Sequence, residues 1–105
     1  MLKLFPASSQ VPLQLPAESD SRYPVVAQLS PRWRVIECRH QIQWVLQRRH
    51  GPGGPESTLR ATWDGRSYRR TKDALIRCCR EHAGELDPSA LLALAALPAR
   101  IGGGL

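Results

Sequence analysis

Five prolines lie within the first 31 residues of this chain, at positions 6, 12, 16, 24 and 31. Proline fixes φ, lacks a backbone N–H donor and disfavours helical backbone in the preceding residue, so no helix of useful length fits here. We therefore predict a flexible arm over residues 1–21, rich in Pro, Ser and Gln. Residues 23–29 can add an edge strand, because Val25 and Val26 favour extended backbone. The folded unit is expected over residues 22–100 as one basic domain, with a frayed tail at 101–105.

Residues 32–40 and 41–50 are predicted to form a pair of strands joined by a tight turn near His40 and Gln41. In the second segment Ile42, Trp44 and Leu46 alternate with polar residues. A period of two predicts that these three side chains are buried, and that Gln41, Gln43, Val45 and Gln47 face outward. The first segment alternates less clearly, and its inner face stays open between Trp33, Val35, Glu37 and Arg34, Ile36, Cys38.

Residues 51–57 are predicted to form a loop because they contain three glycines and two prolines. Residues 58–63 alternate again, with Leu59, Ala61 and Trp63 on one face. Asp64 and Gly65 form a dipeptide typical of a two-residue hairpin turn. Residues 66–70 then either continue the sheet or lead into a helix.

Two helices are predicted to follow. Thr71 is a suitable N-cap, Asp73 suits the first turn, and Gly84 suits the left-handed C-terminal position. Leu75, Cys78, Cys79 and His82 share one helical stripe. A second helix is expected from Pro88 to about Leu97, with Asp87 as its N-cap; it is apolar nearly all round, so it must pack in the core or against a second copy of the chain.

These elements predict an α+β fold: an antiparallel sheet of three or four strands packed on one amphipathic helix, plus a short C-terminal helix. The length of 105 residues suits one small domain. No apolar stretch is long enough to cross a membrane, and no signal peptide is recognised. Three cysteines, two of them adjacent, fit a reducing compartment better than a disulfide framework. A cytoplasmic location is expected.

Positive charge is concentrated in the central segment. Twelve of the fifteen Lys and Arg residues fall within residues 32–82, where they outnumber five acidic residues, so this segment carries a formal charge of +7. The flanking segments are close to neutral. A folded basic core with neutral ends is typical of a surface that binds a polyanion, and nucleic acid is the partner we expect.

If helices cover one face of the sheet, the other face is left for a ligand. Strand residues can enter the DNA major groove, where Gln pairs with adenine and Arg with guanine, and basic residues at a helix start hold phosphate. The predicted nucleic-acid-binding residues are Arg34, Gln43, Gln47, Arg49, Arg60 and Arg66 on the sheet, Arg69, Arg70 and Lys72 at the helix start, and Arg77 and Arg80 as accessory phosphate contacts. Arg39 is an alternative to Arg34.

Three strands followed by an amphipathic helix, with Tyr68 and Thr71-Lys72-Asp73-Ala74-Leu75 entering it, resemble one class of DNA-binding domain. That class includes the arm-binding domains of phage integrases and the plant ethylene-response factors, and the resemblance covers residues 32–83. It implies that the sheet reads the major groove while the helix packs behind it. The chain departs from the class in its Gly/Pro loop and its second helix. The whole chain is also similar to small bacterial proteins of mobile elements, which implies a setting and no activity.

Other chemistries are less well supported. Cys38-x-His40 and Cys79-x-x-His82 offer four zinc ligands, but there is no Cys-x(2–4)-Cys knuckle, and buried cysteines explain the pattern better. Cys78 or Cys79 with His82, and Glu81 or Asp73, is a minimal nucleophilic set, but helix neighbours seldom form a substrate pocket too. We expect no cofactor, no metal site and no catalysis.

The predicted function is therefore non-enzymatic nucleic-acid binding, with duplex DNA preferred over RNA. The alternative is a phage or mobile-element interaction module, an inhibitor or adaptor, whose basic face binds an acidic protein. A homodimer through residues 88–97 is compatible with both, and neither predicts a membrane partner.

Overall fold

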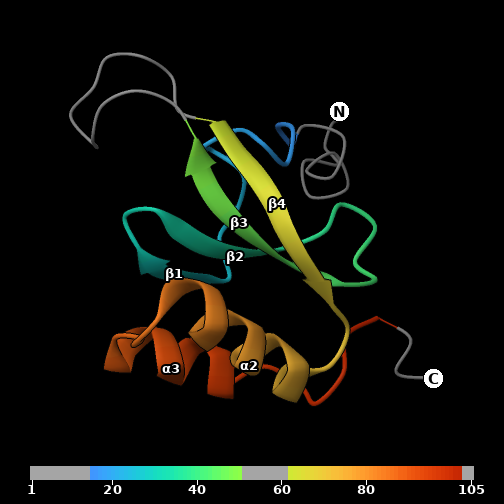
Figure 1. Ribbon diagram of the computed structural model, residues 1–105. Helices are drawn as coiled ribbons and strands as arrows, with labels where there is room; N and C mark the ends of the chain where they lie inside the picture. The colour runs from blue at the N-terminus through green and yellow to red at the C-terminus, as the bar shows by residue number, and fades with distance from the viewer. Residues whose placement is uncertain (1–14, 51–61, 103–105) are drawn as a thin grey trace, which may run out of the picture.

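The computed structural model describes residues 15–50 and 62–102 and confirms the predicted α+β class. Four antiparallel strands form one sheet in chain order: β1 (Ala27–Ser30), β2 (Trp33–Glu37), β3 (Trp44–His50) and β4 (Thr62–Arg69). Two helices, α2 (Lys72–Ala83) and α3 (Pro88–Ala95), follow the sheet and lie together on one side of it (Figure 1). No helix in the described ranges is long and apolar enough to span a membrane.

The local signals at the ends of α2 are confirmed. The Thr71 hydroxyl accepts a hydrogen bond from the backbone N–H of Ala74 at 3.3 Å, and Gly84 closes the helix with a positive φ of 78°. Asp87 stands at the N-cap position of α3, although its side chain makes no capping hydrogen bond. This second helix ends at Ala95, two residues before the predicted end, and Leu97 still bonds back to it.

The main core lies between the sheet and the helices. Trp44 and Leu46 of β3 are buried as predicted, and Val35 takes the same face of β2. Leu75, Cys78 and Cys79 of α2 pack against them, whereas His82 is exposed and its ring lies 5.6 Å from that of Trp33. The half-buried Trp33 also packs on this core, which settles the inner face of β2. In α3, Ala90 and Leu94 are buried while Leu92 is 72% exposed.

The prediction of a hairpin turn at Asp64-Gly65 is wrong. Both residues lie inside β4, a single strand that pairs with β3 from Thr62 to Arg69. Its partners jump from Ser67 opposite Leu46 to Gly65 opposite Gln47, which leaves Arg66 as the extra residue of a bulge. The dipeptide is a local turn signal, and the long pairing with β3 outweighs it.

The second face of the sheet is also covered, which the alternation of residues 41–47 did not predict. Val45 and Gln47 are buried, not outward-facing, and Ile42 is 44% exposed in the turn between β2 and β3, not buried. Residues 15–21, here called the strap, lie across this face. Tyr23, Ile36, Cys38 and Val45 form a second small core with Leu15 packed against it. The strap therefore belongs to the folded unit and not to a flexible arm, and Ile101 of the predicted tail is buried as well. The remaining arm residues, 1–14, and the tail residues 103–105 lie outside the described ranges.

Candidate nucleic-acid interface

Two residues predicted to read DNA bases are buried beneath the strap. Arg34 is 1% exposed and Gln47 is 3% exposed, and they face each other across β2 and β3. The Arg34 Nε donates to Gln47 Oε1 at 2.6 Å. Neither side chain can reach a base edge while the strap is in place. The prediction that both lie on an open sheet face is therefore wrong.

The guanidinium of Arg34 fastens the strap to the sheet. Its NH2 group donates to the backbone oxygens of Glu18 and Asp20, both at 3.0 Å. Gln47 adds a bond from Nε2 to the Glu18 oxygen at 2.9 Å. The Arg34 Cζ also lies 4.3 Å from the ring centroid of Trp63, a cation–π contact in a largely desolvated place. Burial lowers the pKa of Arg34 from its usual value, and an attraction to Asp20 partly opposes this effect.

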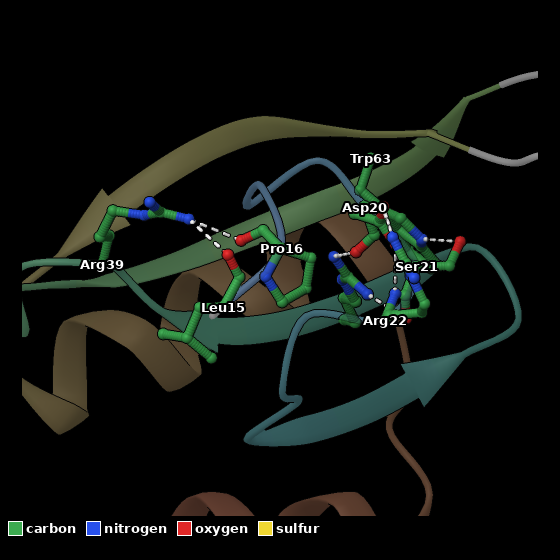
Figure 2. A network of polar contacts seen from close by, with 8 residues as sticks. Leu15, Pro16, Asp20, Ser21, Arg22, Arg39 and Trp63 are labelled. Carbon is green, nitrogen blue, oxygen red and sulfur yellow. Dashed lines mark hydrogen bonds and ion pairs between the residues drawn. The ribbon is translucent and has the colours of Figure 1, made fainter. Parts of the chain in front are cut away.

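Trp63 and Arg39 hold the strap from two further points. The backbone N–H of Trp63 donates to the Ser19 oxygen at 3.0 Å, and its indole N–H donates to the Ser21 hydroxyl at 3.4 Å. At the other end, Arg39 donates from one nitrogen to the backbone oxygens of Leu15 and Pro16, as Figure 2 shows. Arg39 and Arg34 thus both bind the strap, but Arg34 is buried beneath it whereas Arg39 is exposed.

Three exposed arginines lie along β4 and just after it. Arg66 in the bulge, Arg69 at the end of the strand and Arg70 just after it are all exposed. No carboxylate in the described part of the chain pairs with any of the three, and Arg69 donates to the backbone oxygen of Tyr68. β4 is an edge strand, so these side chains border a solvent-facing margin of the sheet.

The other predicted residues take mixed positions. Arg77 and Arg80 are exposed on α2, whereas Gln43 and Arg49 are half-buried. Lys72 is half-buried too, and its ammonium donates to the backbone oxygen of Ala95 at 3.1 Å. Arg60 lies outside the described residues.

Arg48 and Tyr68 were missing from the predicted set. Arg48 is exposed and lies opposite Asp64 of β4 in the register of the sheet. Its position in the Arg48-Arg49 pair at the end of an alternating strand was the sequence feature that could have identified it as exposed. Tyr68 is 52% exposed on β4. It was noted only as part of a resemblance, and nothing in the sequence distinguishes an exposed strand tyrosine from a buried one.

Tyr68 borders an open groove of about 660 Å³ on the strap side of the sheet. The strap forms one wall through Ala17, Glu18 and Ser19, and the turn between β2 and β3 forms another. Residues of β3 and β4 supply the floor. The groove combines an exposed aromatic ring with polar side chains, a composition suited to a partly polar ligand.

The cysteines show no reactive or metal-binding arrangement among the described residues. Cys38, Cys78 and Cys79 are free and buried, and burial raises the pKa of Cys79 to about 12, with Cys78 contributing. A thiol with so high a pKa is a poor nucleophile at neutral pH. Within residues 15–50 and 62–102, no three His, Cys, Asp or Glu side chains gather as a metal site.

Comparison of the chain with protein-family models, with curated proteins and with solved structures found no match.

Proposed function

We propose that this protein binds nucleic acid through phosphate contacts made along β4 and the start of α2. The observation that carries the proposal is the run of Arg66, Arg69 and Arg70, which are exposed and have no carboxylate partner among the described residues. Arginine presents a planar fork of N–H donors that matches a phosphate. Arg77 and Arg80, exposed on α2, are proposed as accessory phosphate contacts.

Phosphate contacts give affinity and orientation without sequence information. Arg34 and Gln47 are buried, so the proposal does not include base reading by the sheet face. Duplex DNA is the first target to test, because the resemblance to three-strand-plus-helix domains favours it. The concentration of charge, +7 within residues 32–82, supports a polyanion of either kind.

The test is a fluorescence-anisotropy titration of a mixed-sequence 30-base-pair duplex at several salt concentrations. The variant Arg66→Ala/Arg70→Ala is compared with Arg22→Ala/Arg32→Ala, which removes the same formal charge from exposed positions outside β4, one of them (Arg22) ion-paired with Asp20 at 3.1 Å. Each lost phosphate contact lowers the slope of log affinity against log salt by about 0.9. We expect the β4 variant to lose affinity and nearly two units of slope, and the control to keep most of both.

Equal losses in the two variants would show that only net charge matters and that β4 is not the contact surface. An absence of binding to this duplex and to a single strand of the same sequence, even at low salt, would overturn the proposal. An acidic protein partner, as in the interaction-module alternative, would then be sought by affinity capture with the same two variants.

A further inference from the structure

The ring of Tyr68 packs against the sheet at a defined position. Its phenol end lies over Gly65, three residues earlier in β4, where a Cβ would overlap the phenol oxygen and lie 2.9 Å from the ring carbon Cζ. Glycine at this position therefore leaves the space that the ring occupies. Tyr68 is nevertheless 52% exposed, so much of its aromatic surface is available to a ligand.

The groove beside Tyr68 has room for a flat ring. Its volume of about 660 Å³ falls within the usual range for small-molecule sites. The side chains of His40 and Gln43 line it and can exchange hydrogen bonds with the edge of a base. Ile42, 44% exposed, adds apolar surface to the same wall.

Charge divides this region into two parts. Glu18 and Arg39 both line the groove, and the Glu18 carboxylate accepts a hydrogen bond from the backbone N–H of Arg39. Their opposite charges offset each other, so the groove itself has no net attraction for a phosphate. Arg66 and Arg69, which flank Tyr68 along β4, do not line the groove. The neutral part of a ligand thus fits inside, and its anionic part fits outside along the strand.

We infer that the groove takes an unpaired nucleobase, stacked on Tyr68, while the phosphates on either side contact the arginines of β4. This inference rests on the proposed function and adds to it a preference for single-stranded or locally unpaired nucleic acid. Base–aromatic stacking tolerates every base because each has a π-face. A base held in a duplex is covered by its neighbours and cannot enter.

The test uses two labelled strands of equal length, a mixed-sequence DNA and a strand of abasic sites that keeps the phosphates without the bases. An RNA strand of the same sequence shows whether the 2′-hydroxyl contributes. Four proteins are compared: wild type, Tyr68→Phe, Tyr68→Ala and Gly65→Ala. The last keeps the tyrosine but places a methyl group where the ring lies. Circular dichroism and urea denaturation establish that each variant is folded.

We expect wild type to bind the DNA strand more tightly than the abasic strand. Tyr68→Ala should weaken binding of the DNA strand by about 5- to 150-fold, the range for one stacked base, and leave the abasic strand unchanged. Tyr68→Phe should bind like wild type, and Gly65→Ala should lose part of the preference. Equal affinity of wild type for both strands, or equal losses on both in Tyr68→Ala, would overturn the groove inference while phosphate binding stands. If neither strand nor the duplex binds at low salt, the proposed function fails and the inference with it.

Discussion

At the scale of single residues, Arg34 is a buried cation whose hydrogen bonds go to neutral acceptors. Three backbone oxygens and one amide oxygen accept its N–H groups, and the face of Trp63 lies beside it. Hydrogen bonds that involve an ionised group are each worth about 1.5–3 kcal/mol, and an acceptor left buried without a donor costs about 1–3 kcal/mol. Arg34 therefore stabilises the fold by holding the strap on the sheet.

We expect Arg34→Ala to lower the free energy of unfolding by about 2–5 kcal/mol, because the Gln47 Oε1 loses its Arg34 donor and the backbone oxygens of Glu18 and Asp20 each lose one of two donors. Urea denaturation measures this loss. Arg32→Ala removes the same charge from an exposed position and should change stability by less than about 0.5 kcal/mol. Equal stability of the two variants would contradict a structural role for Arg34.

The burial of Arg34 could not be predicted from its own strand. Residues 32–40 alternate on both faces with large side chains, so the pattern gave no preferred inner face. Arg34 and Gln47 look like surface residues because burying them requires partners that only the strap supplies, from 13 to 29 residues away. By contrast, Trp44 and Leu46 were predicted correctly because apolar side chains need no specific partner to be buried.

At the scale of elements, α2 follows directly from local signals. Its cap, its first-turn acid, its apolar stripe and its closing glycine all lie within fourteen consecutive residues, and the structure uses each of them. β4 shows the opposite case. Asp64-Gly65 is a local turn signal, but the pairing of seven β4 residues with β3 outweighs it, and Arg66 forms a bulge between the two paired stretches. The bulge also affects how the exposed arginines are arranged: Arg66, Arg69 and Arg70 were all candidates from the sequence, but their arrangement around a bulge was not predictable from it.

The cap of α2 gives a prediction at this scale. Thr71→Ala removes the oxygen that accepts the Ala74 N–H and should lower the free energy of unfolding by about 1 kcal/mol. Thr71→Ser keeps the oxygen and should lie within a few tenths of a kcal/mol of wild type. Thermal or urea unfolding of the three proteins measures both effects. A serine variant as unstable as the alanine variant would show that the threonine methyl group, and not the cap, stabilises the helix start.

At the scale of the whole molecule, the sheet is packed on both faces, by helices on one side and by the strap on the other. The sequence predicted the helical layer and the location of positive charge, because both depend on composition within short segments. It did not predict the strap, because a segment with prolines at 12, 16 and 24 has no periodic pattern to read. The strap covers the centre of one sheet face, so the accessible surface on that side lies near β4. It also forms one wall of the groove beside Tyr68.

The strap and Arg34 should therefore be energetically coupled. A chain that begins at residue 22 lacks the oxygens of Glu18 and Asp20 that Arg34 binds, and it exposes part of the second core, so we expect it to be less stable than a chain that begins at residue 15. Arg34→Ala should then cost at least about 1 kcal/mol less in the shorter chain than in the longer one. Urea denaturation of the four proteins, with trimethylamine oxide added if the short chain is marginally folded, completes the cycle. An identical cost of Arg34→Ala in both chains would mean that Arg34 stabilises the sheet independently of the strap. The strap would then be held on the sheet by other residues, such as Gln47 and Trp63.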